Sequence, residues 1–266
     1  MRDHARGDAD GDPMERLVGW ACTAPSEALK RYCELVELRQ VPMPRPILEI
    51  GCGNGRFTAL AVGHVERGVD VDARSVARAR ELDGVYDRVD QADIRTLVME
   101  PGAYGTVFAN SLLMMLDDPD PVLDLAARAL RPGGALVATV QLPALYDHLV
   151  SRAPRYVRWR YRSLGVATSW TEEEWRAHLE RAGFERITMR GYMPASLSRA
   201  WDAIDGPATI GWGRYRAGIG VRVATDLLPC RARRWYHRRW ATGLRSAYER
   251  RRHDGTPTDL LIVAHR

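Results

Sequence analysis

Apolar and polar positions alternate along residues 46–141 in the pattern of a strand–helix repeat. Short apolar runs predict strands near 46–50, 65–70, 86–91, 106–110 and 135–141. Between these runs, apolar residues recur at spacings of three or four, which predicts helices near 56–63, 74–83 and 119–130. Such regular alternation favours a parallel sheet that is covered by helices on both faces.

The same pattern continues after residue 141 and predicts two more strands, near 186–193 and 259–265. A further helix is predicted near 171–182, where Thr171 and Glu174 form a capping box at its start and Gly183 ends it. The fold class expected from the whole pattern is therefore α/β, with a doubly wound, seven-stranded, mostly parallel sheet.

Composition changes along the chain and suggests five segments. An N-terminal stretch rich in Asp, Gly and Arg is expected to be disordered, and a helical segment broken near Pro25 follows it. The expected boundaries are 1–13 for the disordered stretch, 14–45 for the helical segment, 46–193 for the core, 194–258 for a basic helical insertion and 259–266 for the last strand.

Three glycines follow the first predicted strand, at Gly51, Gly53 and Gly55. Glycine has no Cβ and adopts positive φ at little cost, so this turn brings backbone within contact distance of a ligand. A dinucleotide fingerprint requires the spacing G-x-G-x-x-G. Here the third glycine comes one residue early and Arg56 stands in the place of that fingerprint's last glycine, which argues against a dinucleotide site.

Acidic residues end the next two predicted strands. Asp70 ends the second strand, where a carboxylate can accept hydrogen bonds from both hydroxyls of a ribose. Asp93 follows the third strand. Taken alone, each is also typical of a turn or a helix cap, and Asp72 fits the cap of the helix that follows.

These signals, together with the L-R-P-G-G run of residues 130–134, resemble the class I (Rossmann-like) S-adenosylmethionine (SAM)-dependent methyltransferases of small-molecule type. The resemblance covers residues 46–141. It implies SAM as cofactor, S-adenosylhomocysteine (SAH) as product, and a last strand that runs opposite to the others. The residues then expected to bind the cofactor are Glu49, Gly51, Cys52, Gly53, Asp70, Val71, Asp93, Ile94, Asn110 and Ser111.

The sequence departs from the family pattern where many relatives carry a histidine pair, because Met114 and Met115 stand there. This position therefore offers no general base, and the two methionines either line a pocket or fill the core. Residues 110–113 read N-S-L-L and lack the N-P-P-Y tetrad of methyltransferases that act on nucleic-acid bases. This difference argues against a nucleic-acid acceptor.

In the resembled family, the N-terminal segment often forms a lid, and the acceptor site is built from this lid and the region after the fifth strand. The residues expected to bind substrate are Trp20, Met114, Tyr146 and Tyr161. His148 is the candidate catalytic base, because imidazole titrates near working pH; a local hydrogen bond is the alternative. Five arginines between residues 152 and 162 either bind an acidic acceptor or reflect a composition in which Lys30 is the only lysine.

Residues 214–252 contain twelve arginines and two acidic residues. Tyr236, Trp240, Leu244 and Tyr248 recur every four residues there, which predicts a basic amphipathic helix over 230–252. The insertion is expected to cap the acceptor site, as in relatives that diversify their substrates here. Contact with an anionic membrane and binding of nucleic acid are the alternatives.

Composition limits the remaining possibilities. No apolar run reaches membrane-spanning length and no signal peptide is evident, which predicts a soluble cytoplasmic protein. The expected oligomeric state is a monomer or homodimer. The four cysteines lack metal-ligand spacing, so no metal is expected. The expected activity is methyl transfer to a small organic acceptor, as in natural-product or glycan tailoring. The alternatives are a nucleic-acid or lipid-linked substrate, or a descendant that binds SAM without methylating.

Overall fold

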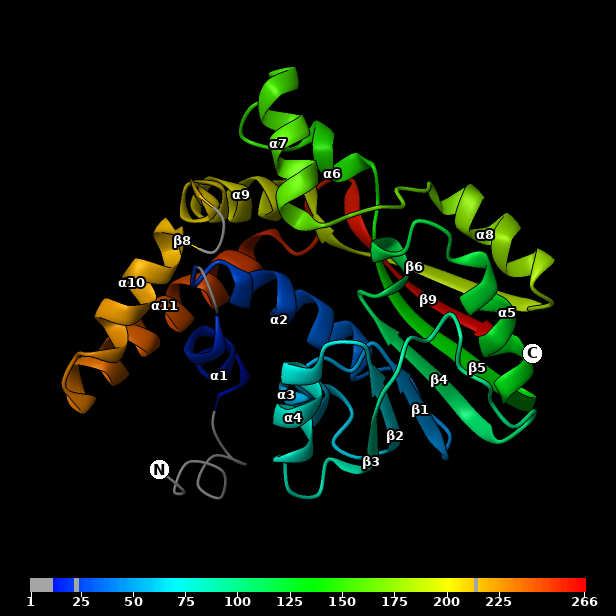
Figure 1. Ribbon diagram of the computed structural model, residues 1–266. Helices are drawn as coiled ribbons and strands as arrows, with labels where there is room; N and C mark the ends of the chain where they lie inside the picture. Colours follow the sequence, from blue (N-terminus) through cyan, green and yellow to red (C-terminus); the bar gives the residue numbers. More distant parts are fainter. Residues whose placement is uncertain (1–11, 22–23, 213–214) are drawn as a thin grey trace. The chain divides into compact units, whose positions relative to one another are not determined.

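A computed structural model describes residues 12–21, 24–212 and 215–266 (Figure 1). The chain forms two compact units. We call residues 37–143, 166–191 and 259–266 the sheet unit, and residues 1–36, 144–165 and 192–258 the helical unit. Of the stretch that was predicted to be disordered, residues 1–11 lie outside the described part of the chain.

The sheet unit is built on seven strands in the order β3-β2-β1-β4-β5-β9-β6. Neighbours among β1 to β5 pair in parallel, whereas β9 pairs antiparallel with β5. The strands are β1 (Ile47–Ile50), β2 (Val65–Asp70), β3 (Tyr86–Gln91), β4 (Tyr104–Asn110), β5 (Leu130–Gln141), β6 (Arg186–Pro194) and β9 (Pro257–His265). The seven strands and the reversed last strand confirm the predicted fold.

β5 begins earlier than the predicted residue 135. Leu130 pairs with Tyr104, and the register then shifts before Thr106 pairs with Ala135. The L-R-P-G-G run therefore forms an irregular first part of the strand, which the apolar pattern alone does not reveal.

The four predicted helices of the sheet unit begin within one residue of the predicted positions, and two of them end two or three residues early. The helical elements of this unit are α3 (Arg56–Ala61), α4 (Ala73–Arg80), the 3-10 turn η1 (Leu113–Met115), α5 (Asp120–Ala129) and α8 (Glu172–Arg181). The Asp72 carboxylate accepts a hydrogen bond from Ser75 N at 2.9 Å and caps α4. At α8, Thr171 and Glu174 form the predicted capping box. These caps satisfy backbone N–H groups that have no partner inside the helix.

The core of the sheet unit is apolar. All four residues of β1 are buried, and so are five of the seven residues of β4. Leu123 on α5 and Trp175 on α8 are fully buried. Burial of each such side chain contributes about 1.5–3 kcal/mol to the free energy of folding. The central strands, and with them the positions of the strand ends, are stabilised by this burial.

The helical unit contains most of the remaining elements (Figure 1). They are α1 (Pro13–Trp20), most of α2 (Glu27–Leu38), α6 (Ala144–Asp147), α7 (Pro154–Leu164), α9 (Ala195–Thr209), β7 (Gly211–Trp212), β8 (Tyr215–Arg216), α10 (Ala217–Asp226) and α11 (Cys230–Arg251). On α11, Ala241, Leu244 and Tyr248 are buried, which confirms the predicted amphipathic helix.

The centre of the helical unit is an ion cluster. Arg160 on α7 is fully buried and contacts Asp202 at 2.7 Å and Asp205 at 2.9 Å, both on α9. Tyr156 also donates a hydrogen bond to Asp202 at 2.8 Å, and the guanidinium of Arg160 lies 4.8 Å from the centre of the Trp201 ring. Since an unpaired buried charge is costly, these contacts fix α7 on α9.

The two units divide the chain differently from the five segments that composition suggested. Residues 144–165 group with the helical unit, although the prediction assigned them to the core. The N-terminal part of the helical unit ends at residue 36, not 45. The predicted change near residue 193 and the return to the sheet at residue 259 lie close to unit boundaries.

Candidate cofactor site

The glycine loop between β1 and α3 has the backbone that only glycine adopts easily. φ is +71° at Gly51, +54° at Gly53 and +71° at Gly55. Gly51 N and Cys52 N both donate to Val69 O, which fastens the loop to β2. No atom lies within 4 Å of where a Cβ on Gly53 would stand. Gly53 therefore offers bare backbone next to open space.

Asp70 ties the loop to the end of β2. One carboxylate oxygen accepts a hydrogen bond from Gly53 N at 2.8 Å, and the other accepts from Asp72 N at 2.8 Å. A carboxylate has about four lone-pair positions, so capacity for further donors remains. Next to it, Val71 is 67% exposed, which leaves an apolar side chain uncovered beside a carboxylate.

Glu49 lies beneath the loop. It is buried, and its two oxygens accept hydrogen bonds from the Thr58 hydroxyl at 2.7 Å and the Tyr86 hydroxyl at 2.6 Å. Burial raises the pKa of Glu49 to about 7 against the lowering effect of these two bonds. Its geometry is that of a cross-link between β1, α3 and β3, and its part in cofactor binding stays a prediction.

Tyr86 is a site residue that the sequence pattern did not identify. A Cβ on Gly55 would lie 2.6 Å from the Tyr86 ring, and a Cβ on Gly68 would lie 2.9 Å from it. The ring therefore fills the space that these two glycines leave, and its hydroxyl reaches Glu49. A glycine inside a strand often marks such a close approach. Gly68, which lies within β2, is therefore the feature of the sequence that could have predicted a close contact here. Cys52 packs in the same cluster, and burial raises the pKa of its thiol.

Asp93 and Ile94 follow β3. The Asp93 carboxylate is bound by the guanidinium of Arg95, with a shortest contact of 2.5 Å, and also accepts from Arg95 N at 3.0 Å. The side-chain bond to Arg95 is the main cause that lowers the pKa of Asp93 to about 2. The side chain is partly exposed, whereas Ile94 is buried. The carboxylate is thus ionised and held in a fixed orientation at the turn.

At the end of β4, Asn110 and Ser111 are held by β5. Asn110 Nδ2 donates to the Thr139 hydroxyl at 3.1 Å, and Ser111 N donates to the same oxygen at 2.9 Å. Ser111 has φ of +52°, an uncommon value for a residue with a side chain. This strained position at a strand end is a typical place for a functional residue.

The sequence left two roles open for Met114 and Met115, lining a pocket or filling the core. Met114 fills the core. Its side chain is buried, and its sulfur accepts a hydrogen bond from Gln141 N at 3.0 Å. Met115 is half exposed. The predicted contact of Met114 with substrate therefore has no support in this environment.

All of this geometry lies at the carboxyl ends of β1, β2, β3 and β4, where ligands bind in open α/β sheets. Residues 48–138 match a family described as "Methyltransferase domain". Residues 48–138 therefore form a class I SAM-dependent methyltransferase domain. The cofactor of this family is SAM, as the sequence predicted.

Two curated relatives show the range of this methyltransferase family. The 27-O-demethylrifamycin SV methyltransferase of Amycolatopsis mediterranei (strain S699) is 33% identical over 152 residues, 52% of this chain and 53% of that one. A trans-aconitate 2-methyltransferase of Variovorax paradoxus (strain S110) is 26% identical over 72% of this chain and 75% of that one. In the first two curated matches, the aligned part spans only about half of the relative's length.

A solved structure supports the fold. A SAM-dependent methyltransferase from Thermotoga maritima, described as a possible histamine N-methyltransferase, gives a TM-score of 0.56 at 17% identity and covers 88% of each chain. At this identity, the likeness concerns the fold and not the substrate.

The strand ends of this methyltransferase domain fit SAM. The bare backbone at Gly53 leaves room for a close approach by the ligand, and the Asp70 carboxylate suits the hydroxyls of a ribose. The exposed Val71 offers an apolar surface for a base. We expect Gly51, Cys52 and Gly53 to hold the methionine part, Asp70 the ribose, and Asp93 and Ile94 the adenine.

The other predicted site residues belong to the helical unit. Tyr146 and Tyr161 lie together, with ring centres 4.7 Å apart. His148 follows α6, is partly buried, and donates its backbone N–H to Leu145 O at 3.0 Å. Trp20 ends α1, and the Arg16 guanidinium lies 5.0 Å from its ring. Within this unit, the structure therefore brings together two of the four residues, Tyr146 and Tyr161.

Proposed function

We propose that this protein transfers the methyl group of SAM to a small organic acceptor of the natural-product or glycan-tailoring type. The observation that carries the proposal is the glycine loop tied to Asp70, with open space at Gly53. The similarity to a rifamycin methyltransferase supports a natural-product acceptor, and the similarity to trans-aconitate methyltransferases supports a small carboxylic acid.

When bound, SAM would supply a methyl group to an acceptor in line with the methyl carbon–sulfur bond, and the electron pair of that bond would stay on sulfur, which leaves as the neutral thioether of SAH. The residues of the loop and of the strand ends would hold and orient the cofactor, and positioning of the acceptor supplies much of the rate. A hydroxyl or amine acceptor must also lose a proton, and His148 is the proposed base for it.

The first test is calorimetric titration of SAM and SAH into the wild type and Asp70→Ala. We expect Asp70→Ala to weaken binding by about tenfold to a hundredfold, because it removes a charged hydrogen-bond acceptor and frees Gly53. Asp87→Ala is the matched control, since Asp87 is an exposed carboxylate on β3. Failure of the wild type to bind either compound would contradict the proposal.

The second test is release of SAH with a panel of aromatic hydroxyl, sugar hydroxyl and carboxylic acid acceptors. Turnover with at least one class is expected, and His148→Gln should lower kcat without changing the affinity for SAM. Tight SAM binding without SAH release from any acceptor would favour a descendant that binds SAM without methylating.

A further inference from the structure

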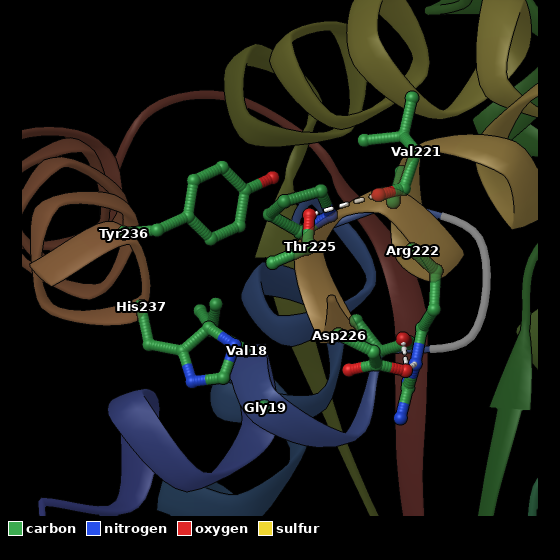
Figure 2. Close-up of a pocket in the computed structure, with 11 residues that line it drawn as sticks. Val18, Gly19, Val221, Arg222, Thr225, Asp226, Tyr236 and His237 are labelled. Carbon is green, nitrogen blue, oxygen red and sulfur yellow. Dashed lines mark hydrogen bonds and ion pairs between the residues drawn. The ribbon is translucent and has the colours of Figure 1, made fainter. Parts of the chain in front are cut away.

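The helix pair α10–α11 has an inner side and an outer side. On the inner side lies a small pocket of about 30 Å³ (Figure 2). It is lined by Val221, Arg222, Thr225 and Asp226 of α10, by Tyr236 and His237 of α11, and by Val18, Gly19, Ala21, Ala24 and Pro25 at and after the end of α1. Arg222 pairs with Asp226 at 3.4 Å, and Arg233 Nη1 donates to Asp226 O at 3.3 Å. These groups are satisfied within the unit, so the inner side needs no further partner.

The outer side of α10 is apolar and exposed. Ile219, Val223 and Leu227, the last directly after α10, follow one another at intervals of four residues, so they form one stripe along the helix. None of the three is among the residues that line the pocket. Val223 is 54% exposed and Leu227 is 80% exposed. Such a row of exposed aliphatic side chains marks an interaction surface.

The helix that follows, α11, also has an exposed face, and this face is basic. Arg231, Trp235 and Arg239 lie at intervals of four residues, on the face opposite the buried Ala241, Leu244 and Tyr248. Trp235 is 67% exposed. Within the part of the chain that the structure describes, Arg231, Arg234 and Arg239 have no acidic partner. We call the stripe of α10, Leu228 and this face of α11 the basic apolar tip.

We propose that the basic apolar tip binds an anionic lipid surface, with Leu227, Leu228 and Trp235 entering the headgroup boundary and the arginines contacting lipid phosphates. An apolar ridge next to arginines and a tryptophan is the composition of helices that lie in a membrane interface. No described helix is long and apolar enough to cross a membrane, so the tip lies on the surface.

Charge decides against a second copy of the chain as the occupant. A twofold contact would place the same patch on both sides, and unpaired arginines would then face arginines. Residues 214–252 contain only Asp226 and Glu249 against twelve arginines, and Asp226 already pairs with Arg222. An anionic surface supplies the missing countercharge.

The test is sedimentation of the full chain with vesicles of pure phosphatidylcholine and with vesicles that contain about one third phosphatidylglycerol. We expect binding only to the anionic vesicles, and weaker binding as salt rises. Arg231→Gln and Arg234→Gln should each weaken binding about fivefold. Leu227→Gln with Trp235→Gln should weaken it at least about tenfold.

Matched controls separate a specific surface from general charge. Arg155→Gln with Arg199→Gln removes two exposed arginines from other helices of the same unit and should leave vesicle binding unchanged. All these positions are exposed, so thermal melting should show folded variants. Loss of binding in the control pair equal to that of the tip variants would overturn the proposal.

Cys230 gives a second, independent readout because it is an exposed free thiol two residues after Leu228. In a Cys22→Ser background, a polarity-sensitive dye on Cys230 should shift to shorter emission wavelengths with anionic vesicles. No binding to either vesicle would overturn the proposal and leave an acidic protein as the candidate. Self-association without lipid that Leu227→Gln abolishes would also overturn it, in favour of a second copy.

Discussion

The two units of this chain differ in where their charged side chains lie. In the sheet unit, carboxylates stand at strand ends around a glycine loop, above a core of apolar side chains. In the helical unit, a buried arginine pairs with two buried aspartates, and the exposed Arg231, Arg234 and Arg239 on α11 have no acidic partner among the described residues. The family match, residues 48–138, lies wholly in the sheet unit. The candidate cofactor site thus lies over a largely apolar core with one buried carboxyl, Glu49, whereas the helical unit buries a complete ion cluster beside its apolar side chains.

The largest expected effect is on the buried ion cluster. Arg160→Met should destabilise the helical unit by about 3–5 kcal/mol, because Asp202 and Asp205 lose their cation while remaining buried. Urea unfolding followed by circular dichroism measures the loss. Arg158→Met, an exposed neighbour on α7, should change stability by less than about 0.5 kcal/mol. Equal effects of the two variants would show that the cluster does not hold the unit together.

Two glycine-to-alanine changes, one in each unit, should change the free energy of unfolding in opposite directions. Gly68→Ala in β2 should destabilise by about 1–3 kcal/mol, because its Cβ would lie 2.9 Å from the Tyr86 ring and 3.2 Å from Cys52 Sγ. Gly243→Ala in α11 meets no atom within 4 Å and should stabilise the chain by about 0.5–1 kcal/mol. Thermal unfolding of both variants checks the signs, and a neutral Gly68→Ala would contradict the close packing around Tyr86.

The buried carboxyl of the sheet unit predicts a pH dependence. The pKa of Glu49 rises from 4.5 to about 7 on folding, so the folded state binds more protons than the unfolded state between these values. Stability therefore falls as pH rises through that interval, by about 1 kcal/mol per pH unit from this group. Glu49→Gln should flatten the slope, which urea unfolding from pH 4.5 to 7.5 would measure. An unchanged slope would exclude Glu49 as its source.

A further expected effect, of about the same size, concerns a helix cap in the sheet unit. Thr171→Ala should cost about 1 kcal/mol, since it removes the side-chain acceptor for Glu174 N. Thr171→Ser keeps that acceptor and should stay within a few tenths of a kcal/mol. Hydrogen exchange of the first turn of α8 would localise the change, and exchange unaltered in Thr171→Ala would contradict the role of the cap.

Local signals predicted most of the sheet unit. The short apolar runs predicted the seven strands. The helix cap at Asp72 and the capping box at Thr171 are also at the positions that the sequence predicted. The contact of Tyr86 with Gly55 and Gly68 was not predictable, because it depends on how three segments meet in space. The same holds for Arg160, whose partners on α9 lie far along the chain and follow no period.

The close fit of Tyr86 against Gly68 also constrains how this chain can evolve. Gly68 has no left-handed backbone, so a larger residue there is opposed by its neighbours, the Tyr86 ring first and Cys52 Sγ second. Gly55 differs, because its φ of +71° keeps any side chain strained. Substitution at position 68 therefore requires that Tyr86 is first replaced by a smaller residue. The intermediate carries a destabilising cavity until a larger residue at position 68 fills it. The pair is epistatic, and descendants should change both residues or neither.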